Sequence, residues 1–120
     1  MIHPLTFFPL QGIVWHQGKS NLGSSDEYAD LFMSLIADWR DKWQKPQMPF
    51  YFVQLSNHGK KEEIQDDSDW AAIREAQAQT LHLNHTGMVV TTDIGKGKSN
   101  TFQSTLETGL RLSQLALKQT

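Results

Sequence analysis

Three short apolar runs constrain the fold of this chain more than any other feature. They cover residues 12–15 (GIVW), 50–55 (FYFVQL) and 88–92 (MVVTT), and they are rich in β-branched and aromatic residues. Strands of a parallel sheet have this composition because helices cover both of their faces, so neither face needs polar residues. The runs therefore predict three buried parallel strands.

A helix is expected between the first two runs. Apolar side chains recur there at spacings of three and four residues, which is typical of a helix with one buried face. They are Tyr28, Leu31, Phe32, Leu35, Ile36, Trp39 and Trp43. Ser24 followed by Glu27 predicts a capping box at the start of this helix, and Pro46 ends it.

Two further helices are expected later in the chain. One runs over residues 70–82, with Asp67 or Ser68 as its N-cap. The other runs over residues 103–118 and is expected to bury Leu106, Leu110, Leu117 and their neighbours. Strands and helices that alternate in this way predict a parallel α/β sheet with flanking helices, joined by right-handed crossovers.

Ligands of such sheets bind beyond the carboxyl ends of the strands, where residues 16–25, 56–69 and 93–101 form the loops. The first loop follows its strand with His16, Gln17, Lys19, Ser20 and Asn21, hinged on Gly18. Many hydrogen-bonding side chains at this edge predict the rim of a functional site. Three strands alone make a narrow sheet with unpaired edges, which indicates that further strands are missing.

Composition narrows the classes of partner. The chain has 120 residues, which suits a single domain over residues 1–120, and its net charge of −2 gives no case for nucleic acid or an anionic membrane. No run approaches the ~20 apolar residues of a membrane span, and the N-terminus lacks a signal-peptide pattern, so the cytoplasm is the default location. The absence of cysteine excludes disulfide and thiolate chemistry.

Metal binding is not expected. His82 and His85 are three residues apart at a helix end, a spacing compatible with a metal, but no third ligand stands near them in the sequence. A solvated helix C-terminus, where a cation is favoured by the helix dipole, explains them more simply.

Six sequence blocks together carry a family resemblance. In order they are GIVWHQGKSN, LIADWRDKW, MPFYFVQL, DWAAIREAQ, TGMVVTTDIG and TGLRLSQLAL. They resemble the later part of the sialate O-acetylesterase-like carbohydrate esterases of the SGNH hydrolase superfamily. The resemblance covers nearly the whole chain, as a partial domain of about three strands. It implies a flavodoxin-like fold and a serine esterase that removes acetyl groups from sugar hydroxyls without a metal or cofactor.

The resemblance also implies roles for individual residues. The side-chain amide of Gln17 matches an oxyanion donor, and His16, Lys19, Asn21 and Arg74 match positions near the substrate. His16 stands where the family has tyrosine, so rim or packing is its expected role. A structural ion pair is an equal alternative for Arg74.

Three departures bear on activity. The nucleophilic serine block of the family lies upstream of this chain, and the family's aspartate and histidine fall near Ser99 or Asn100 and at about Thr101, where neither residue type stands. The family's glutamate in Q-G-E-S-N is Lys19 here.

Two functions are consistent with these departures. The first is a truncated, inactive acetylesterase fragment. The second is a non-catalytic carbohydrate- or protein-binding module, in which Lys19 favours acidic ligands. In both, a homodimer or a complementing N-terminal segment is expected to cover the open sheet edge.

Overall fold

Three parallel strands form the centre of the molecule, as the apolar runs predict. The structure, a computed structural model, describes residues 2–55, 67–91 and 101–119. The strands are β1 (Ile13–Trp15), β2 (Phe50–Val53) and β3 (Thr86–Val89), and they lie in the order β1-β2-β3. Both neighbours of β2 run parallel to it.

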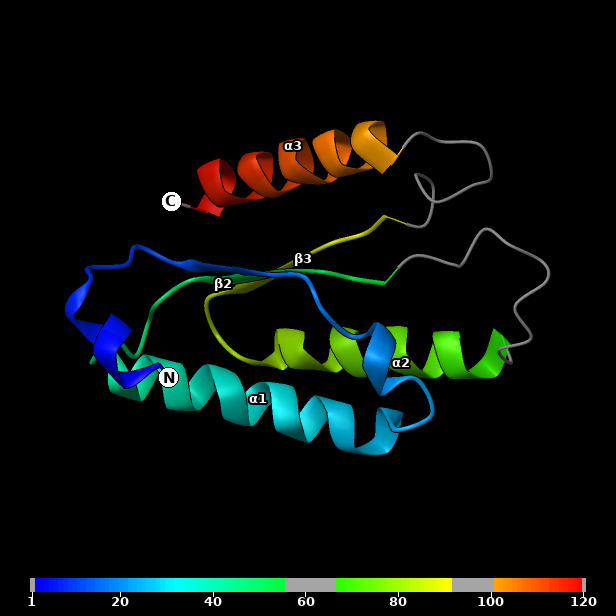
Figure 1. Ribbon diagram of the computed structural model, residues 1–120, viewed down its shortest axis with the longest axis horizontal. Helices are drawn as coiled ribbons and strands as arrows, with labels where there is room; N and C mark the ends of the chain where they lie inside the picture. Colours follow the sequence, from blue (N-terminus) through cyan, green and yellow to red (C-terminus); the bar gives the residue numbers. More distant parts are fainter. Residues whose placement is uncertain (1, 56–66, 92–100, 120) are drawn as a thin grey trace.

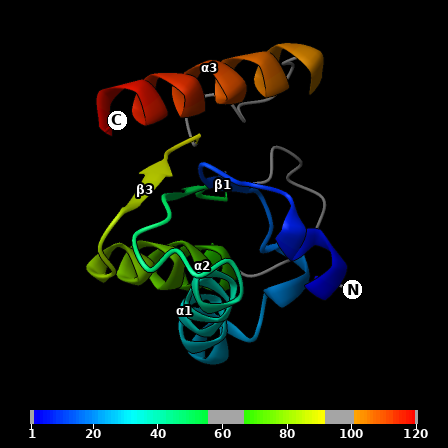
Figure 2. The same cartoon turned by 90° about the vertical axis from the view of Figure 1, so that its left-hand side faces the viewer.

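Helices cover both faces of this sheet. Figures 1 and 2 show α1 (Ser25–Lys42) and α2 (Asp67–Gln79) side by side on one face and α3 (Thr101–Gln119) on the other. The described residues also include short 3₁₀ helices, which are η1 (His3–Phe7), η2 (Lys19–Asn21) and η3 (Thr80–His82). The expected flavodoxin-like α/β arrangement with flanking helices is therefore confirmed.

The central strand β2 is buried along its whole length. No residue of Phe50–Val53 is more than 5% exposed. Phe50 and Phe52 point toward α1, where the Phe32 ring contacts both of theirs at centroid distances of 6.1 and 5.1 Å. A strand with two buried faces has no position for a polar side chain, which explains why this run is continuously apolar.

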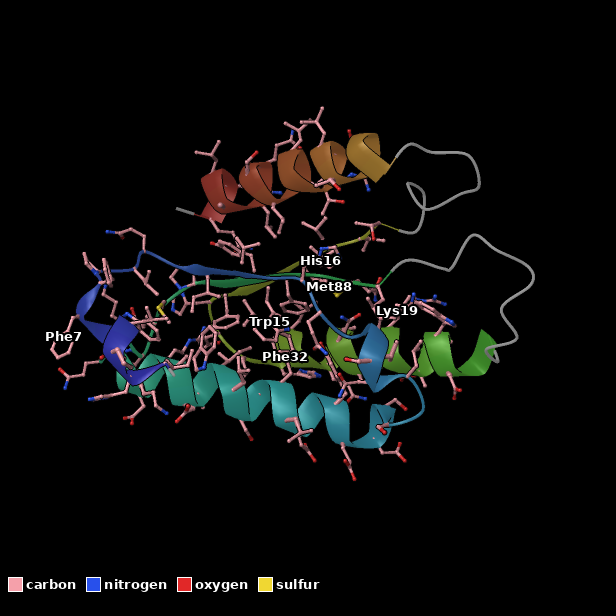
Figure 3. All side chains as sticks on the ribbon, viewed as in Figure 1. Phe7, Trp15, His16, Lys19, Phe32 and Met88 are labelled. Atoms are coloured by element: carbon pink, nitrogen blue, oxygen red, sulfur yellow. The ribbon has the colours of Figure 1, made fainter. Side chains whose placement is uncertain are left out.

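Aromatic side chains bind β1 to α1. Trp15 stacks on Phe32 at 5.9 Å and meets Trp39 edge-on at 5.8 Å. Figure 3 shows Trp15 beside Phe32 on the α1 side of the sheet. Trp15 and Trp39 therefore serve packing, as does Trp70, which is 8% exposed in the core.

The other face of the sheet contacts α3 through a small residue. A Cβ on Gly87 would lie 2.9 Å from Leu115 Cδ2 and 3.0 Å from Tyr51 Cδ1, so only glycine lets the leucine approach β3. The prediction that α3 buries Leu106, Leu110 and Leu117 is wrong, because they are 63%, 51% and 78% exposed. The stripe that includes Leu115 packs on the sheet instead.

Several predicted boundaries also differ from the structure. Ser24 occupies the N-cap of α1, but its side chain makes no cap hydrogen bond, so the capping box is wrong. Asp67 and Ser68 already lie inside α2 rather than capping it. Strand β3 begins at Thr86, two residues early, because Thr86 and Gly87 pair with Phe50 and Tyr51. The helix expected to reach residue 82 ends at Gln79 and continues as η3.

Strand β1 forms one edge of the described sheet. Val14, in the middle of this strand, is 59% exposed, whereas its neighbour Tyr51 on β2 is 5% exposed. Leu31 on α1, below the same edge, is 58% exposed. An apolar strand edge of this kind is a surface on which another strand can pair. Within the described residues, no helix is both long and apolar enough to cross a membrane.

Candidate functional site

The loop that follows β1 is wound tightly against the start of α1. Asn21 N–H donates to the Gly18 carbonyl at 2.9 Å, and Ser24 N–H donates to the Asn21 carbonyl, also at 2.9 Å. Gly18 has a φ of 150°, in the region that favours glycine. Residues 16–24, hereafter the β1 rim, therefore connect the carboxyl end of β1 to the start of α1 through successive tight turns.

The side-chain amide of Gln17 is engaged within this rim. Its Nε2 donates to Asn21 Oδ1 at 2.6 Å and to Ser20 Oγ at 3.2 Å. A carboxamide nitrogen carries two hydrogens, so both donors already have acceptors. The structure thus brings Gln17, Ser20 and Asn21 together, and the side chain must rotate before Gln17 can donate to a substrate oxyanion.

The backbone carbonyl of Gln17 accepts hydrogen bonds from side chains of two helices. Tyr28 on α1 donates its hydroxyl to this oxygen at 3.1 Å, and Gln77 on α2 donates its Nε2 at 3.3 Å. Gln77 is only 1% exposed. Its Oε1 accepts from the Leu55 N–H at 2.9 Å, and its Nε2 also donates to the Val53 carbonyl at 3.3 Å.

Sequence reasoning missed Gln77, although a signal was present. Gln77 stands in the buried stripe of α2 with Trp70, Ile73 and Ala76, and Thr80 of η3 continues this stripe. A polar residue on the apolar face of a helix must find partners inside the protein. Its position therefore indicated hydrogen bonds inside the protein, but the sequence pattern does not identify their partners.

Burial affects the ionisation of Tyr28. Desolvation raises the pKa of its phenol above the ordinary value of 10, and the neighbouring side chains of Gln77 and Trp15 act in the opposite direction. The phenol is therefore protonated at neutral pH and available as the donor to Gln17.

The remaining predicted site residues that the structure describes lie on the β1 rim, on α2 and at the start of α3. Figure 3 shows where His16 and Lys19 lie on the β1 rim, and both are exposed. Arg74 is half-buried on α2, and its backbone carbonyl accepts from Gln54 Nε2 at 3.1 Å, next to the end of β2. Ser99 and Asn100 lie outside the described residues, and Thr101 is the first residue of α3.

A small hollow of about 90 Å³ lies beneath the β1 rim. It is lined by Trp15, Gln17, Asn21, Tyr28, Leu31, Phe32 and Leu35. Within the described part of the chain, the buried Trp15 Nε1 has no hydrogen-bond acceptor. That part also holds no group of three or more histidine, cysteine or acidic residues able to bind a metal, and His82 and His85 are exposed.

Comparison with known proteins identifies the family. A family model described as "Carbohydrate esterase, sialic acid-specific acetylesterase" matches residues 4–118. The chain belongs to this family. It is 36% identical to mouse sialate O-acetylesterase over 93 residues, which is 71% of this chain and 16% of the mouse protein. It is 39% identical to the human sialate O-acetylesterase over 74 residues, which is 55% of this chain and 14% of that protein.

Solved structures agree with the family match. A carbohydrate acetylesterase from Xanthomonas citri superposes with a TM-score of 0.76 and 36% identity, over 93% of this chain and 26% of that chain. A protein from Arabidopsis thaliana superposes with a TM-score of 0.72 and 21% identity, over 92% of this chain and 45% of that one, and shows the shared fold. The present chain spans only about a sixth to a seventh of the length of the curated relatives cited above.

The Tyr28→Phe variant tests the contact between α1 and the β1 rim. We expect it to lower the free energy of unfolding by about 0.5–1.5 kcal/mol at neutral pH, because the hydrogen bond to Gln17 is lost. Above pH 10 the unfolded phenol loses its proton before the folded one, so wild-type stability falls with rising pH, and the variant loses less.

Chemical unfolding between pH 8 and about pH 11 measures both effects. Tyr51→Phe, on the other face of the sheet, is the matched control. Parallel pH profiles for wild type and Tyr28→Phe would contradict the burial argument.

Proposed function

We propose that this chain carries one rim of a carbohydrate acetylesterase site and that the chain by itself does not hydrolyse sugar acetates. The observation that carries the proposal is the β1 rim, which stands at the carboxyl edge of the sheet with its Gln17 amide already bonded to Asn21 and Ser20. Binding groups are present there, but within the described residues no serine hydroxyl is hydrogen-bonded to a histidine ring.

The proposal that the chain is inactive depends on the catalytic groups of a serine esterase rather than on the β1 rim. Acyl transfer by a serine needs a nucleophile and a base that are hydrogen-bonded to each other, as well as donors for the oxyanion. Loss of the nucleophile or base in a serine hydrolase lowers turnover on the order of 10⁶-fold, which oxyanion contacts do not restore. The aligned region is only 16% of the mouse relative, so most of such a protein lies outside it.

Acetate release tests this proposal directly. Incubated with an O-acetylated sialic acid and with 4-nitrophenyl acetate, the purified chain is expected to release acetate no faster than buffer. The full-length mouse relative serves as the positive control. Turnover above buffer that survives repurification and is lost in Gln17→Ala would contradict inactivity.

A second candidate function is carbohydrate binding without catalysis. Lys19 favours it, because an exposed cation stands on the β1 rim where the family pattern has glutamate. An anionic sugar is then the preferred ligand, since the positive charge attracts its carboxylate.

Calorimetry with sialic acid measures that binding. Weak affinity is expected for the wild type, with a loss of several-fold in Lys19→Glu and no change in Lys118→Glu, at the far end of α3. Equal affinity in the two variants, or no heat with the wild type, would exclude a role for Lys19.

We also propose that the β1 edge is covered by a further strand, from a second copy of the chain or from a complementing segment. The exposed side chains of Val14 and Leu31 support this, because a parallel strand ordinarily has both faces buried. Light scattering on the chain alone is expected to give a dimer that Val14→Lys weakens. A monomer at concentrations of about 100 μM would leave a complementing segment as the occupant.

A further inference from the structure

We infer that Gln77 is the positioning residue of the β1 rim. Its buried amide fixes the Gln17–Gly18 peptide against β2 and so sets the direction in which the β1 rim presents its side chains. This inference rests on the proposed function for the importance of the rim, but its geometry and its test do not require any activity.

The Gln77 amide acts where the sheet itself ends. Trp15 and Phe52 are the last pair of residues in the ladder between β1 and β2. Beyond them, Gln77 Nε2 reaches both the Gln17 carbonyl and the Val53 carbonyl at 3.3 Å, and its Oε1 accepts from Leu55 N–H at 2.9 Å. The Gln77 side chain thus links the segment after β1 to the end of β2, beyond the last hydrogen bonds between these two strands.

The hydrogen bond from Gln77 to the Gln17 carbonyl fixes the orientation of the whole Gln17–Gly18 peptide. The Gln17 carbonyl oxygen accepts from both Gln77 and Tyr28, so both of its acceptor sites are used. The peptide that follows is planar and trans, which directs the Gly18 N–H away from these two donors. The orientation of that peptide is therefore determined by two helices that lie on one face of the sheet.

Packing around Gly18 supports the same conclusion. A Cβ at this position would lie 3.1 Å from Leu55 Cδ1 and 3.2 Å from Gln77 Nε2. The rim backbone therefore lies directly against the Gln77 amide, with no space for a side chain or a water molecule between them. A displacement of the amide must move the peptide.

The test compares Gln77→Met with Gln79→Met, an exposed position on the same helix. Gln77→Met is expected to lower the melting temperature by roughly 5–10 °C and to shift the Gly18 amide and the Gln17 side-chain NH₂ resonances in a ¹H–¹⁵N spectrum. Resonances at the end of α1 are expected to stay in place, and Gln79→Met is expected to change neither quantity.

The spectrum separates positioning from simple stabilisation. If Gln77→Met melts earlier but its Gln17 and Gly18 resonances keep their wild-type positions, the inference is overturned. Should this variant not fold, the wild type decides: slowly exchanging Gln77 side-chain NH₂ protons with a nuclear Overhauser contact to Gly18 Hα support the inference, and their absence overturns it. Because no substrate is used, a failed acetate assay does not affect this outcome.

Discussion

Burial of β2 on both faces is the constraint on which the rest of the structure depends. Phe50–Val53 pair with β1 on one side and β3 on the other, and helices cover both faces. The Phe32 ring contacts Trp15, Phe50 and Phe52, so it joins α1 to two strands at once. Such close-packed contacts place the carboxyl ends of β1 and β2 side by side.

The candidate site follows from that alignment. At the carboxyl edge the chain leaves the sheet, and backbone groups that would otherwise lack partners must find them elsewhere. Gln77 supplies partners for three of these groups, and Tyr28 supplies a second donor for the Gln17 carbonyl. The side chains of the β1 rim are then left to bond with each other, as Gln17 does with Asn21 and Ser20.

The residues at the carboxyl edge of the sheet lie within the part of the chain that matches the family. The family match covers residues 4–118 and therefore includes both α2 and the β1 rim. The described residues form a scaffold that orients a loop at the carboxyl edge of a parallel sheet. Chemistry on a sugar ester requires, in addition, a nucleophile and base in hydrogen-bond contact.

Much of the fold could be predicted from the sequence, because a continuously apolar run such as residues 50–55 is compatible with few environments. The packing of α3 could not. Its leucines form two stripes, one with Leu106, Leu110 and Leu117 and one with Leu115, and helical periodicity does not say which of them meets the sheet. The small size of Gly87, on a different element, decides it.

The site was predictable only in part. Gln17 and Asn21 were identified from a strand that ends in polar residues, and the structure brings these two together. Gln77 was missed because glutamine in a helix is usually exposed. Its role depends on backbone groups 22 to 60 residues away in the sequence, a relation that local patterns do not contain.

Native-state hydrogen exchange of the Leu55 amide tests the central claim most directly. This N–H lies two residues beyond the end of β2, and its acceptor is the Gln77 side chain. If the buried amide holds the carboxyl edge together, the protection of Leu55 is expected to be within about tenfold of that of Phe52 in the strand. Exchange of Leu55 as fast as that of the exposed rim residue Lys19 would contradict the account.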